Sequence, residues 1–344
     1  MRVDEFDYHL PQELIAQYPA EPRDSSRLLV IHRASGELEH RHFSDLPEYL
    51  RAGDCLALND TKVVPARLLG VKLPTGARTE VMLVRPVAEG RWEALIKRND
   101  RVKQGAVIEF GNGLLRARVL SETLTHHLRL VQLEHEGPLA EALEAVGHIP
   151  LPPYIKREED DPRDRERYQT VFARQPGAVA APTASLHFTP ELLESLRRQG
   201  IGEAHTTLHV SLGTFQPVQV DEVEQHQVHP EWYTVSPDAA EKLNAARAAG
   251  GRLVGVGTTV ARTLETVSRS GRIEPGSGDT TLFCYPGFEF KVLDALVTNF
   301  HLPRSSLLML VAAFAGLDLM RRAYAVAVEE GYRFYSYGDA MLII

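Results

Sequence analysis

The chain has 344 residues, of which 44% are hydrophobic and 24% charged, so it is long and apolar enough to bury a substantial core. Its net charge of −8 excludes a uniformly basic nucleic-acid-binding protein, and no apolar run reaches the roughly 18 residues of a membrane span. Two cysteines, Cys55 and Cys284, exclude a disulfide framework and a thiol metal site. Because the N-terminus lacks a signal-peptide core, we expect a cytoplasmic protein.

The charge is unevenly distributed along the chain. Residues 62–118 contain 12 Lys and Arg and 5 Asp and Glu, a local net charge of +7, so the remainder carries −15. A basic segment inside an acidic protein is a candidate surface for nucleic-acid phosphates. The alternative is an exposed β-module that carries arginines for solubility.

The first 62 residues combine short helical and extended runs. Residues 27–33 predict a strand, residues 37–42 its hairpin partner, and residues 43–50 a short helix. Residues 55–59 (CLALN) predict a buried strand. It ends in a polar cluster made of Asn59, Asp60, Thr61 and Lys62.

The pattern changes after this cluster. Six short strand-like runs follow, separated by turn signals such as Gly111-Asn112-Gly113, and they predict a small closed or nearly closed barrel. The α/β pattern then returns. The sequence therefore predicts a larger mixed α/β domain, residues 1–62 and 149–344, interrupted by an inserted six-stranded β-barrel domain, residues 63–148.

The C-terminal part alternates strands and helices. Thr189-Pro190 is typical of a helix start, and Gly200 of a helix stop. The run KREEDDPRDRERY at residues 156–168 mixes both signs of charge and is interpreted as a solvated loop. Further strands are expected at residues 203–210 and 253–256, and helices at residues 189–198, 237–249 and from residue 258.

The stretch 279–316 has the order strand, polar loop, helix. Residues 282–285 and 292–297 predict buried strands, and residues 307–315 a buried helix that Ser305 or Ser306 caps. In an open α/β sheet such a loop lies at the carboxyl ends of the strands, where ligands usually bind. The alternative is a capped helix with a solvated loop. The polar side chains are Thr298, Asn299, His301, Arg304, Ser305 and Ser306.

Two familiar motifs are incomplete. Gly255-Val256-Gly257 follows a strand, but Val260 replaces the third glycine of a dinucleotide fingerprint. The helix start after Gly257 can still hold a carboxylate or a phosphate. His205 and His209 lie four residues apart on an expected strand, roughly 13 Å from each other, which is too far to share one ion. We therefore expect no metal.

Several titratable residues end apolar runs. His187, His209 and His301 are candidate acids or bases because imidazole titrates near neutrality, although each alone is compatible with a structural role. Asp294 lies inside an apolar run and needs a partner or a raised pKa. Two other classes stay open from the residues alone: a non-catalytic RNA-binding protein and a metal-dependent hydrolase.

Long ordered motifs resemble one family across essentially the whole chain. They include LNDTKVVPARL, GHIPLPPYI, AAPTASLHFTPELL, VGTTVARTLE, YPGFEFKVLDALVTNFHLP and YRFYSYGDAMLI. They are similar to the S-adenosylmethionine:tRNA ribosyltransferase-isomerases of queuosine biosynthesis. The chain departs from that pattern at Ser185, at Ser211-Leu212 and at Val260-Ala261.

The resemblance implies a reaction in which S-adenosylmethionine is consumed as a ribosyl donor. The acceptor is 7-aminomethyl-7-deazaguanine at the wobble position of a tRNA with a GUN anticodon, and the products are epoxyqueuosine in tRNA, adenine and methionine. A base removes a proton next to the sulfonium, adenine leaves, the amine attacks, and an epoxide closes as methionine departs. The resemblance also implies a monomer.

Given this chemistry, we expect three groups of site residues. His301 and Asp294 are the expected acid or base, with His187 and His209 as alternates. Gly257, Thr258, Thr259, Arg262 and Asn299 are expected to bind the donor. Asn59, Asp60, Thr61 and Lys62 are expected to meet the substrate, and Arg67, Arg85, Lys97, Arg98, Arg101 and Lys103 to contact tRNA.

Overall fold

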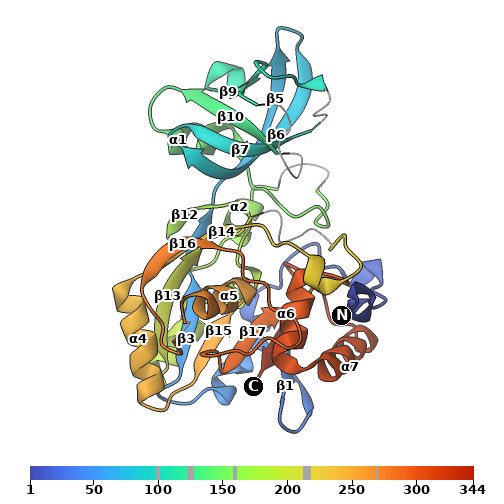
Figure 1. Cartoon of the computed structure of the whole chain (residues 1–344), viewed down its shortest axis with the longest axis vertical. Coiled ribbons are helices and arrows are strands. Elements are labelled where there is room, and N and C mark those ends of the chain that lie inside the picture. The colour runs from blue at the N-terminus through green and yellow to red at the C-terminus, as the bar shows by residue number, and fades with distance from the viewer. Residues whose placement is uncertain (98–100, 122–127, 158–160, 212–217, 269) are drawn as a thin grey trace.

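The computed structural model describes residues 1–344 except 98–100, 122–127, 158–160, 212–217 and 269. A small antiparallel barrel stands above a larger α/β domain (Figure 1). Strand β4 (Thr61–Val63) leads into the barrel and β11 (Gly147–His148) leads out of it. The predicted fold class, an α/β domain interrupted by a barrel, is confirmed. The domain boundaries at residues 62/63 and 148/149 stay a prediction.

The described part of the α/β domain contains a nine-stranded mixed sheet with the order β16-β14-β13-β3-β15-β17-β18-β1-β2. Strands β13, β3, β15 and β17 are parallel neighbours, so their carboxyl ends lie at one edge. Because β3 runs directly into β4 and the barrel, this is the edge that faces the barrel (Figure 1). The strands are β1 (Arg27–Ile31), β2 (Leu38–His42), β3 (Cys55–Asn59), β13 (Gly202–Leu208), β14 (Glu231–Val235), β15 (Leu253–Val256), β16 (Gly276–Thr280), β17 (Ala295–Asn299) and β18 (Ala340–Ile343).

Alternation along the central strands builds a core on each face of the sheet. In β3, Ala57 packs with the helices on one face, whereas Leu56 and Leu58 pack with α3 and a short helix on the other. Every residue of β3 is buried, as expected for a strand covered on both sides. The longer helices here are α3 (Pro190–Arg198), α4 (Pro237–Ala248), α5 (Thr258–Val267), α6 (Ser306–Ala315) and α7 (Leu317–Glu329).

The barrel closes because β5 pairs with both β6 and β8. Its inward residues alternate with exposed ones, as β9 shows with Leu115, Ala117 and Val119 buried. Among the described residues its strands are β5 (Arg67–Leu73), β6 (Ala77–Ala88), β7 (Arg91–Ile96), β8 (Val107–Phe110), β9 (Leu115–Val119) and β10 (Leu128–His135), with helix α1 (Leu139–Val146) behind them. This confirms the six predicted strands.

Short elements connect these parts. Thr189 caps α3 and Ser305 caps α6, as predicted, since their side chains accept from the backbone N–H groups of Leu192 and Leu308. The remaining elements are 3-10 turns at Val3–Phe6, Gln12–Leu14, Arg23–Ser25, Phe43–Tyr49, Gly111–Gly113, Thr183–His187 and Val223–Gln225, helix α2 (Asp164–Arg167) and strand β12 (Gln175–Ala178).

Two sequence-based expectations are wrong. Residues 282–285 form no strand, because the edge position next to β14 is taken by β16, just before them. In the described part of 156–168, Arg157 and Asp164 form a nearly buried ion pair and residues 164–167 form α2, so that part is not simply a solvated loop. Tertiary contacts there outweigh the polar composition.

Candidate active site

The four parallel strands deliver polar residues to the barrel-facing edge of the sheet. Asn59 ends β3, Gly257 and Thr258 follow β15, and His301 follows β17. Direct hydrogen bonds join neighbouring strand ends: Asn59 Nδ2 donates to Thr259 Oγ1 over 3.3 Å, and the Gly257 N–H donates to the Val297 carbonyl over 2.8 Å. The structure thus gathers most of the predicted site at one edge.

His301 is held tightly at this edge. Its Nε2 lies 2.7 Å from Thr298 Oγ1. Its backbone N–H donates to the Tyr324 hydroxyl over 2.9 Å, and its carbonyl accepts from the Tyr8 hydroxyl over 2.5 Å. Burial lowers the pKa of His301 to about 3, so its imidazole is neutral near pH 7 and can accept a proton. Its Nδ1 bonds no described residue and is the nitrogen left for a ligand.

His187 is buried beside the end of β17. Its Nδ1 lies 2.7 Å from Ser26 Oγ, and its Nε2 accepts from Asn299 Nδ2 over 3.3 Å. The same amide nitrogen donates to the Tyr335 carbonyl over 2.9 Å, which fixes the orientation of Asn299. Burial, assisted by the charge of Arg333, lowers the pKa of His187 to about 3. Both ring nitrogens of His187 therefore already have protein partners in this structure.

His209 follows β13 and lies next to β4. Its Nδ1 is 2.8 Å from Thr61 Oγ1, and its ring stacks on Trp232 with centroids 5.1 Å apart. Burial lowers its pKa as well. A Cβ on Gly177, whose φ is +149°, would lie 2.6 Å from His209 Nε2, so the ring packs directly on a glycine backbone. His209 is therefore neutral and fixed, close to the entrance to the barrel.

The start of α5 offers backbone N–H groups to a ligand. Gly257 occupies the N-cap with φ +93° and supplies no side chain to cap the helix. Thr258 and Thr259 are buried in the first turn, and Thr259 Oγ1 accepts from Asn59. A Cβ on Gly257 would lie 3.7 Å from Ala184, so the turn that carries Ser185 and His187 lies across from this helix start. Such an uncapped N-terminus favours an anion.

Arg262 does not lie free for this anion. Its guanidinium forms a nearly buried ion pair with Glu231 and donates to the Leu282 carbonyl over 2.9 Å. Glu231 in turn accepts from the Ser211 N–H over 2.8 Å. The expectation that Arg262 binds the donor stays a prediction, and such binding would have to share a guanidinium that already pairs with Glu231. The pair borders a cavity of about 270 Å³ that His226 and Cys284 also line.

The cluster at the end of β3 is mainly structural. Asn59 Oδ1 accepts from the Leu208 and Thr61 N–H groups, so this amide holds β3, β13 and β4 together. Asp60 accepts from the Thr207 hydroxyl over 2.7 Å. Lys62 is exposed on β4 and is the residue of this cluster that faces solvent. Within this cluster, Lys62 is therefore the side chain that a ligand from solvent can reach.

Asp294 is not part of the gathered site. It precedes β17, whereas His301 follows it, so the length of the five-residue strand, roughly 16 Å, separates them. Asp294 is exposed, and its carboxylate accepts from the Leu253 N–H over 2.8 Å. Asp294 thus lies at the amino end of the sheet, where its carboxylate tethers β15, and at the opposite end of β17 from His301.

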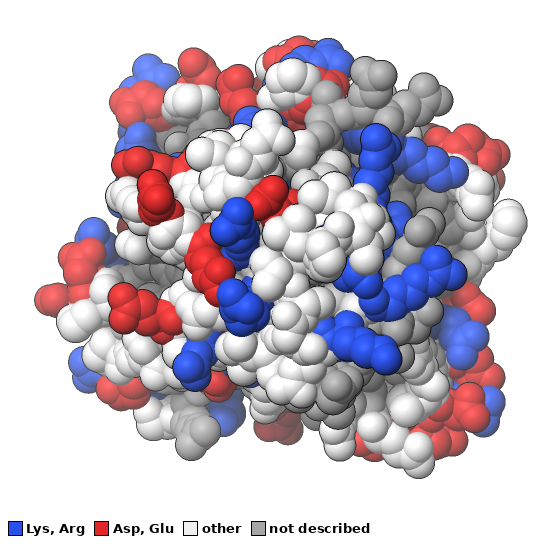
Figure 2. All heavy atoms as spheres, turned by 90° about the horizontal axis from the view of Figure 1, so that it is seen from above, with Lys and Arg blue, Asp and Glu red and all other residues white. Residues whose placement is uncertain are grey.

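The basic residues of the barrel are partly neutralised. Arg85 pairs with Glu93 over 2.6 Å and Arg67 with Glu80 over 3.3 Å. Lys97, Arg101 and Lys103 are exposed, and Arg98 lies outside the described residues. Figure 2, which views this end of the molecule, shows Lys and Arg gathered right of the centre and both signs of charge interspersed on the left. The basic character is thus concentrated on one side.

Some residues at the edge were not found from the sequence. Tyr8 and Tyr324 hold the backbone of His301, and Ser26 holds His187. Sequence separations of 293 and 161 residues leave no spacing signal for such contacts. Ser185 is fully buried, and its hydroxyl has no partner in the part of the chain that the structure describes.

Two further observations concern ions and membranes. Over the described ranges, no group of three or more His, Cys, Asp or Glu side chains is arranged to hold a metal ion. In the same residues no helix combines the length and the apolar character needed to cross a membrane.

The fold and the site define an α/β enzyme with an inserted β-barrel and a polar strand edge between its two parts. A family model described as "Queuosine biosynthesis protein" matches residues 3–343. S-adenosylmethionine:tRNA ribosyltransferase-isomerases of Moorella thermoacetica and Symbiobacterium thermophilum are 57% and 55% identical, each over 100% of both chains. The crystal structure of S-adenosylmethionine tRNA ribosyltransferase from Thermotoga maritima is similar at 42% identity and a TM-score of 0.58, over 99% of this chain and 100% of that one. The chain belongs to the queuosine biosynthesis protein family.

Proposed function

We propose that this protein transfers and isomerises the ribosyl moiety of S-adenosylmethionine onto 7-aminomethyl-7-deazaguanine at the wobble position of a tRNA with a GUN anticodon. The products are epoxyqueuosine-tRNA, adenine and methionine. The full-length similarity to S-adenosylmethionine:tRNA ribosyltransferase-isomerases is the observation that carries the activity. We place the reaction at the barrel-facing edge of the sheet because four parallel strands end there.

The donor is a sulfonium nucleoside with a carboxylate at its amino-acid end. The uncapped start of α5, with Thr258 and Thr259, suits that carboxylate because N–H groups and the helix dipole favour an anion. Asn299 contributes by fixing His187 and the Tyr335 backbone beside it, since its amide nitrogen is shared between them. We assign donor binding to Gly257, Thr258 and Thr259.

His301 is the group we assign to proton transfer. In this proposal Nε2–H donates to Thr298 Oγ1, which leaves the Nδ1 lone pair free for the proton on the carbon next to the sulfonium. The electron pair of that C5′–H bond forms a C4′=C5′ bond as the C4′–O4′ bond breaks, and the O4′ electrons form a carbonyl at C1′ as the C1′–N9 bond to adenine breaks. The imidazolium returns the proton to adenine. The acceptor amine then attacks, and ring closure to the epoxide breaks the carbon–sulfur bond as methionine leaves.

A neutral imidazole suits this order of events. Burial keeps His301 neutral near pH 7, so its Nδ1 lone pair is available; the pKa of about 3 makes this imidazole a weak base and its imidazolium a strong acid toward adenine. His209 and Thr61 lie where β13 and β4 approach the barrel, so they are placed for the acceptor end of the reaction. Lys62 is exposed on the same strand for a phosphate.

Release of free adenine tests this function. The protein is incubated with S-adenosylmethionine and tRNA that carries 7-aminomethyl-7-deazaguanine, and adenine is measured by liquid chromatography. We expect adenine in proportion to modified tRNA, and none when the tRNA carries guanine at the wobble position. Methylated tRNA with S-adenosylhomocysteine in place of adenine would contradict the proposal.

We further propose that the protein acts as a monomer in the cytoplasm, where its tRNA substrate resides. Static light scattering over a range of concentrations tests the first part. A constant mass near 38.3 kDa is expected, and a stable doubling would contradict it.

A further inference from the structure

A groove of about 900 Å³ lies between the barrel and the α/β domain. One wall is formed by Met82 and Leu95 on the outer face of β6 and β7, and the other by the Pro-rich segment that leaves the barrel. Its volume is at the upper end of the roughly 300–1,000 Å³ that ligand pockets occupy. None of the residues assigned above to donor binding or to proton transfer lines this groove.

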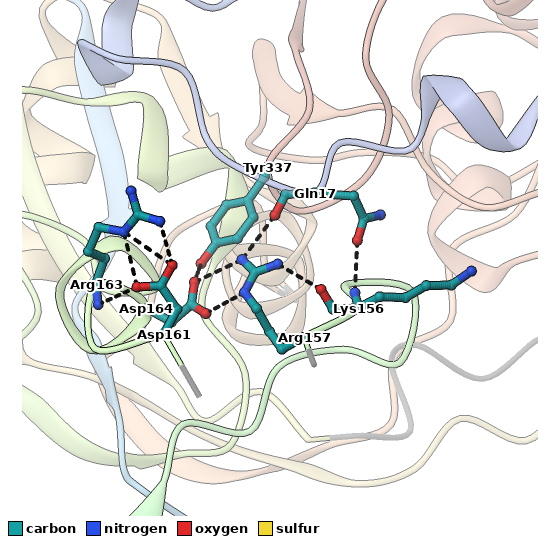
Figure 3. Close-up of polar contacts among 7 residues, drawn as sticks. All are labelled: Gln17, Lys156, Arg157, Asp161, Arg163, Asp164 and Tyr337. Atoms are coloured by element: carbon teal, nitrogen blue, oxygen red, sulfur yellow. Dashed lines mark hydrogen bonds and ion pairs between the residues drawn. The ribbon is translucent and has the colours of Figure 1, made fainter. Parts of the chain in front are cut away.

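The floor of the groove is a buried charge network (Figure 3). Arg157 pairs with Asp164 through bonds of 2.7 and 3.1 Å, and Tyr337 donates to the same carboxylate over 3.0 Å. Arg157 also donates to the Gln17 carbonyl over 2.9 Å, and the Gln17 side chain accepts from the Lys156 N–H. The segment below the groove is therefore tied to both the N-terminal and the C-terminal parts of the chain.

The same floor reaches the candidate active site. Val63, Leu186 and Tyr337 share one buried cluster with Ile155 of the groove. Leu186 immediately precedes His187, and Val63 ends the strand that carries Thr61. A ligand in the groove thus lies above the packing layer that supports the edge residues.

Over the described residues that line it, the groove is positive once its ion pairs are taken into account. The acids among these residues are all paired: Glu80 with Arg67, Asp161 with Arg163, and Asp164 with Arg157. Lys97 and Lys156, on opposite sides of the groove, are exposed, and neither ammonium pairs with a described residue. Two cations that no described acid pairs, placed beside an apolar wall, match a strand of phosphates with unstacked bases.

We propose that this groove binds the single-stranded anticodon loop of the tRNA, with backbone phosphates on Lys97 and Lys156 and a loop base between Leu95 on one wall and Pro152 on the other. The inference rests on the proposed function, which supplies an RNA substrate. Loops fit better than stems, because their bases are splayed and sequence-specific RNA recognition usually targets them. The anticodon arm is then held by both parts of the protein.

Charge reversal tests the groove. The affinity for full-length tRNA is measured by filter retention at several salt concentrations for Lys97→Glu, Lys156→Glu and the double variant. Each lost phosphate contact should reduce the magnitude of the negative slope of log affinity against log salt by about 0.7. The double variant should reduce it by about 1.4. Affinity for S-adenosylmethionine, measured by calorimetry, should stay unchanged, which also shows that the variants are folded.

Lys242→Glu is the matched control, because Lys242 is an exposed lysine on α4 and the substitution changes the net charge equally. The groove assignment is overturned if Lys97→Glu and Lys156→Glu each bind tRNA with the affinity and salt slope of Lys242→Glu. This result is distinct from failure of the proposed function, in which the wild-type protein releases no adenine. A photo-crosslink from 4-thiouridine in the anticodon loop should map to residues 148–156 or 95–97; crosslinks confined to another face would also overturn it.

Discussion

His301 Nε2 and Thr298 Oγ1 lie 2.7 Å apart in a buried setting, and this contact leaves Nδ1 as the available ring nitrogen. Thr298→Val keeps the side-chain shape but removes the hydroxyl, so the ring loses its fixed orientation and a buried ring nitrogen loses its partner. We expect a destabilisation of about 1–3 kcal/mol together with a lower rate of adenine release. Thr298→Ser keeps the hydroxyl and should restore most of the rate. Equal rates for Val and wild type would show that the contact does not position the ring.

Stability should fall as the solution becomes acidic. His187 and His301 have pKa values of about 3 in the folded chain, against about 6.5 when unfolded. Between these values the unfolded chain binds protons that the folded chain excludes, so the free energy of unfolding decreases by about 1.4 kcal/mol per pH unit for each histidine. His301→Gln should reduce that slope by about one such step in urea unfolding between pH 4 and 6. An unchanged slope would show that His301 is not neutral in the fold.

The packing of His209 on Gly177 predicts a steric effect. In Gly177→Ala the new Cβ would lie 2.6 Å from His209 Nε2 at a φ of +149°. The ring must leave Thr61 and Trp232, so we expect a loss of about 1–3 kcal/mol in unfolding free energy and weaker turnover. Gly276→Ala is the control, because no atom lies within 4 Å of its added Cβ. Equal melting temperatures for the two variants would contradict the packing argument.

Arg262 and Glu231 form a nearly buried ion pair, so removing one partner leaves an uncompensated charge. Arg262→Leu should cost about 3–5 kcal/mol of unfolding free energy. The double variant Arg262→Leu with Glu231→Leu should recover a large part of that loss, because both charges are then absent. A double-mutant cycle by urea unfolding measures the coupling. Additive losses would show that the two side chains do not interact.

Much of the fold could be predicted because its signals are local. Thr189 and Ser305 predicted the helix starts, and alternating runs separated by Gly-containing turns predicted the barrel. The strand predicted at residues 282–285 failed because apolar content alone does not tell a strand from a half-buried segment, while the Gly-rich β16 has no strand signal. The prediction of a solvated loop at residues 156–168 failed because Arg157 and Asp164 bond Gln17 and Tyr337, which are distant in sequence.

The placement of the candidate site residues could also be predicted in part, because some of its signals are local. Polar residues at the ends of apolar runs predicted that His301 and Thr258 would lie at the same sheet edge, since parallel strands bring their carboxyl ends together. The sequence could not show that Asp294 lies before β17, because strand boundaries estimated from sequence patterns are uncertain by a few residues. The partner that neutralises Arg262 depends on the pairing of distant strands. Only the folded chain shows which polar groups are already occupied.

The central claim is that His301 transfers the proton at the barrel-facing edge of the sheet. Its most direct test is the single-turnover rate of adenine release for His301→Ala, with protein and S-adenosylmethionine in excess over substrate tRNA. His40→Ala is the control, because His40 also hydrogen bonds a hydroxyl, that of Tyr332, but lies on β2 away from the edge. We predict a rate about 10²-fold or more below wild type for His301→Ala and a near wild-type rate for His40→Ala. A wild-type rate for His301→Ala, with tRNA and S-adenosylmethionine still bound, would contradict the account.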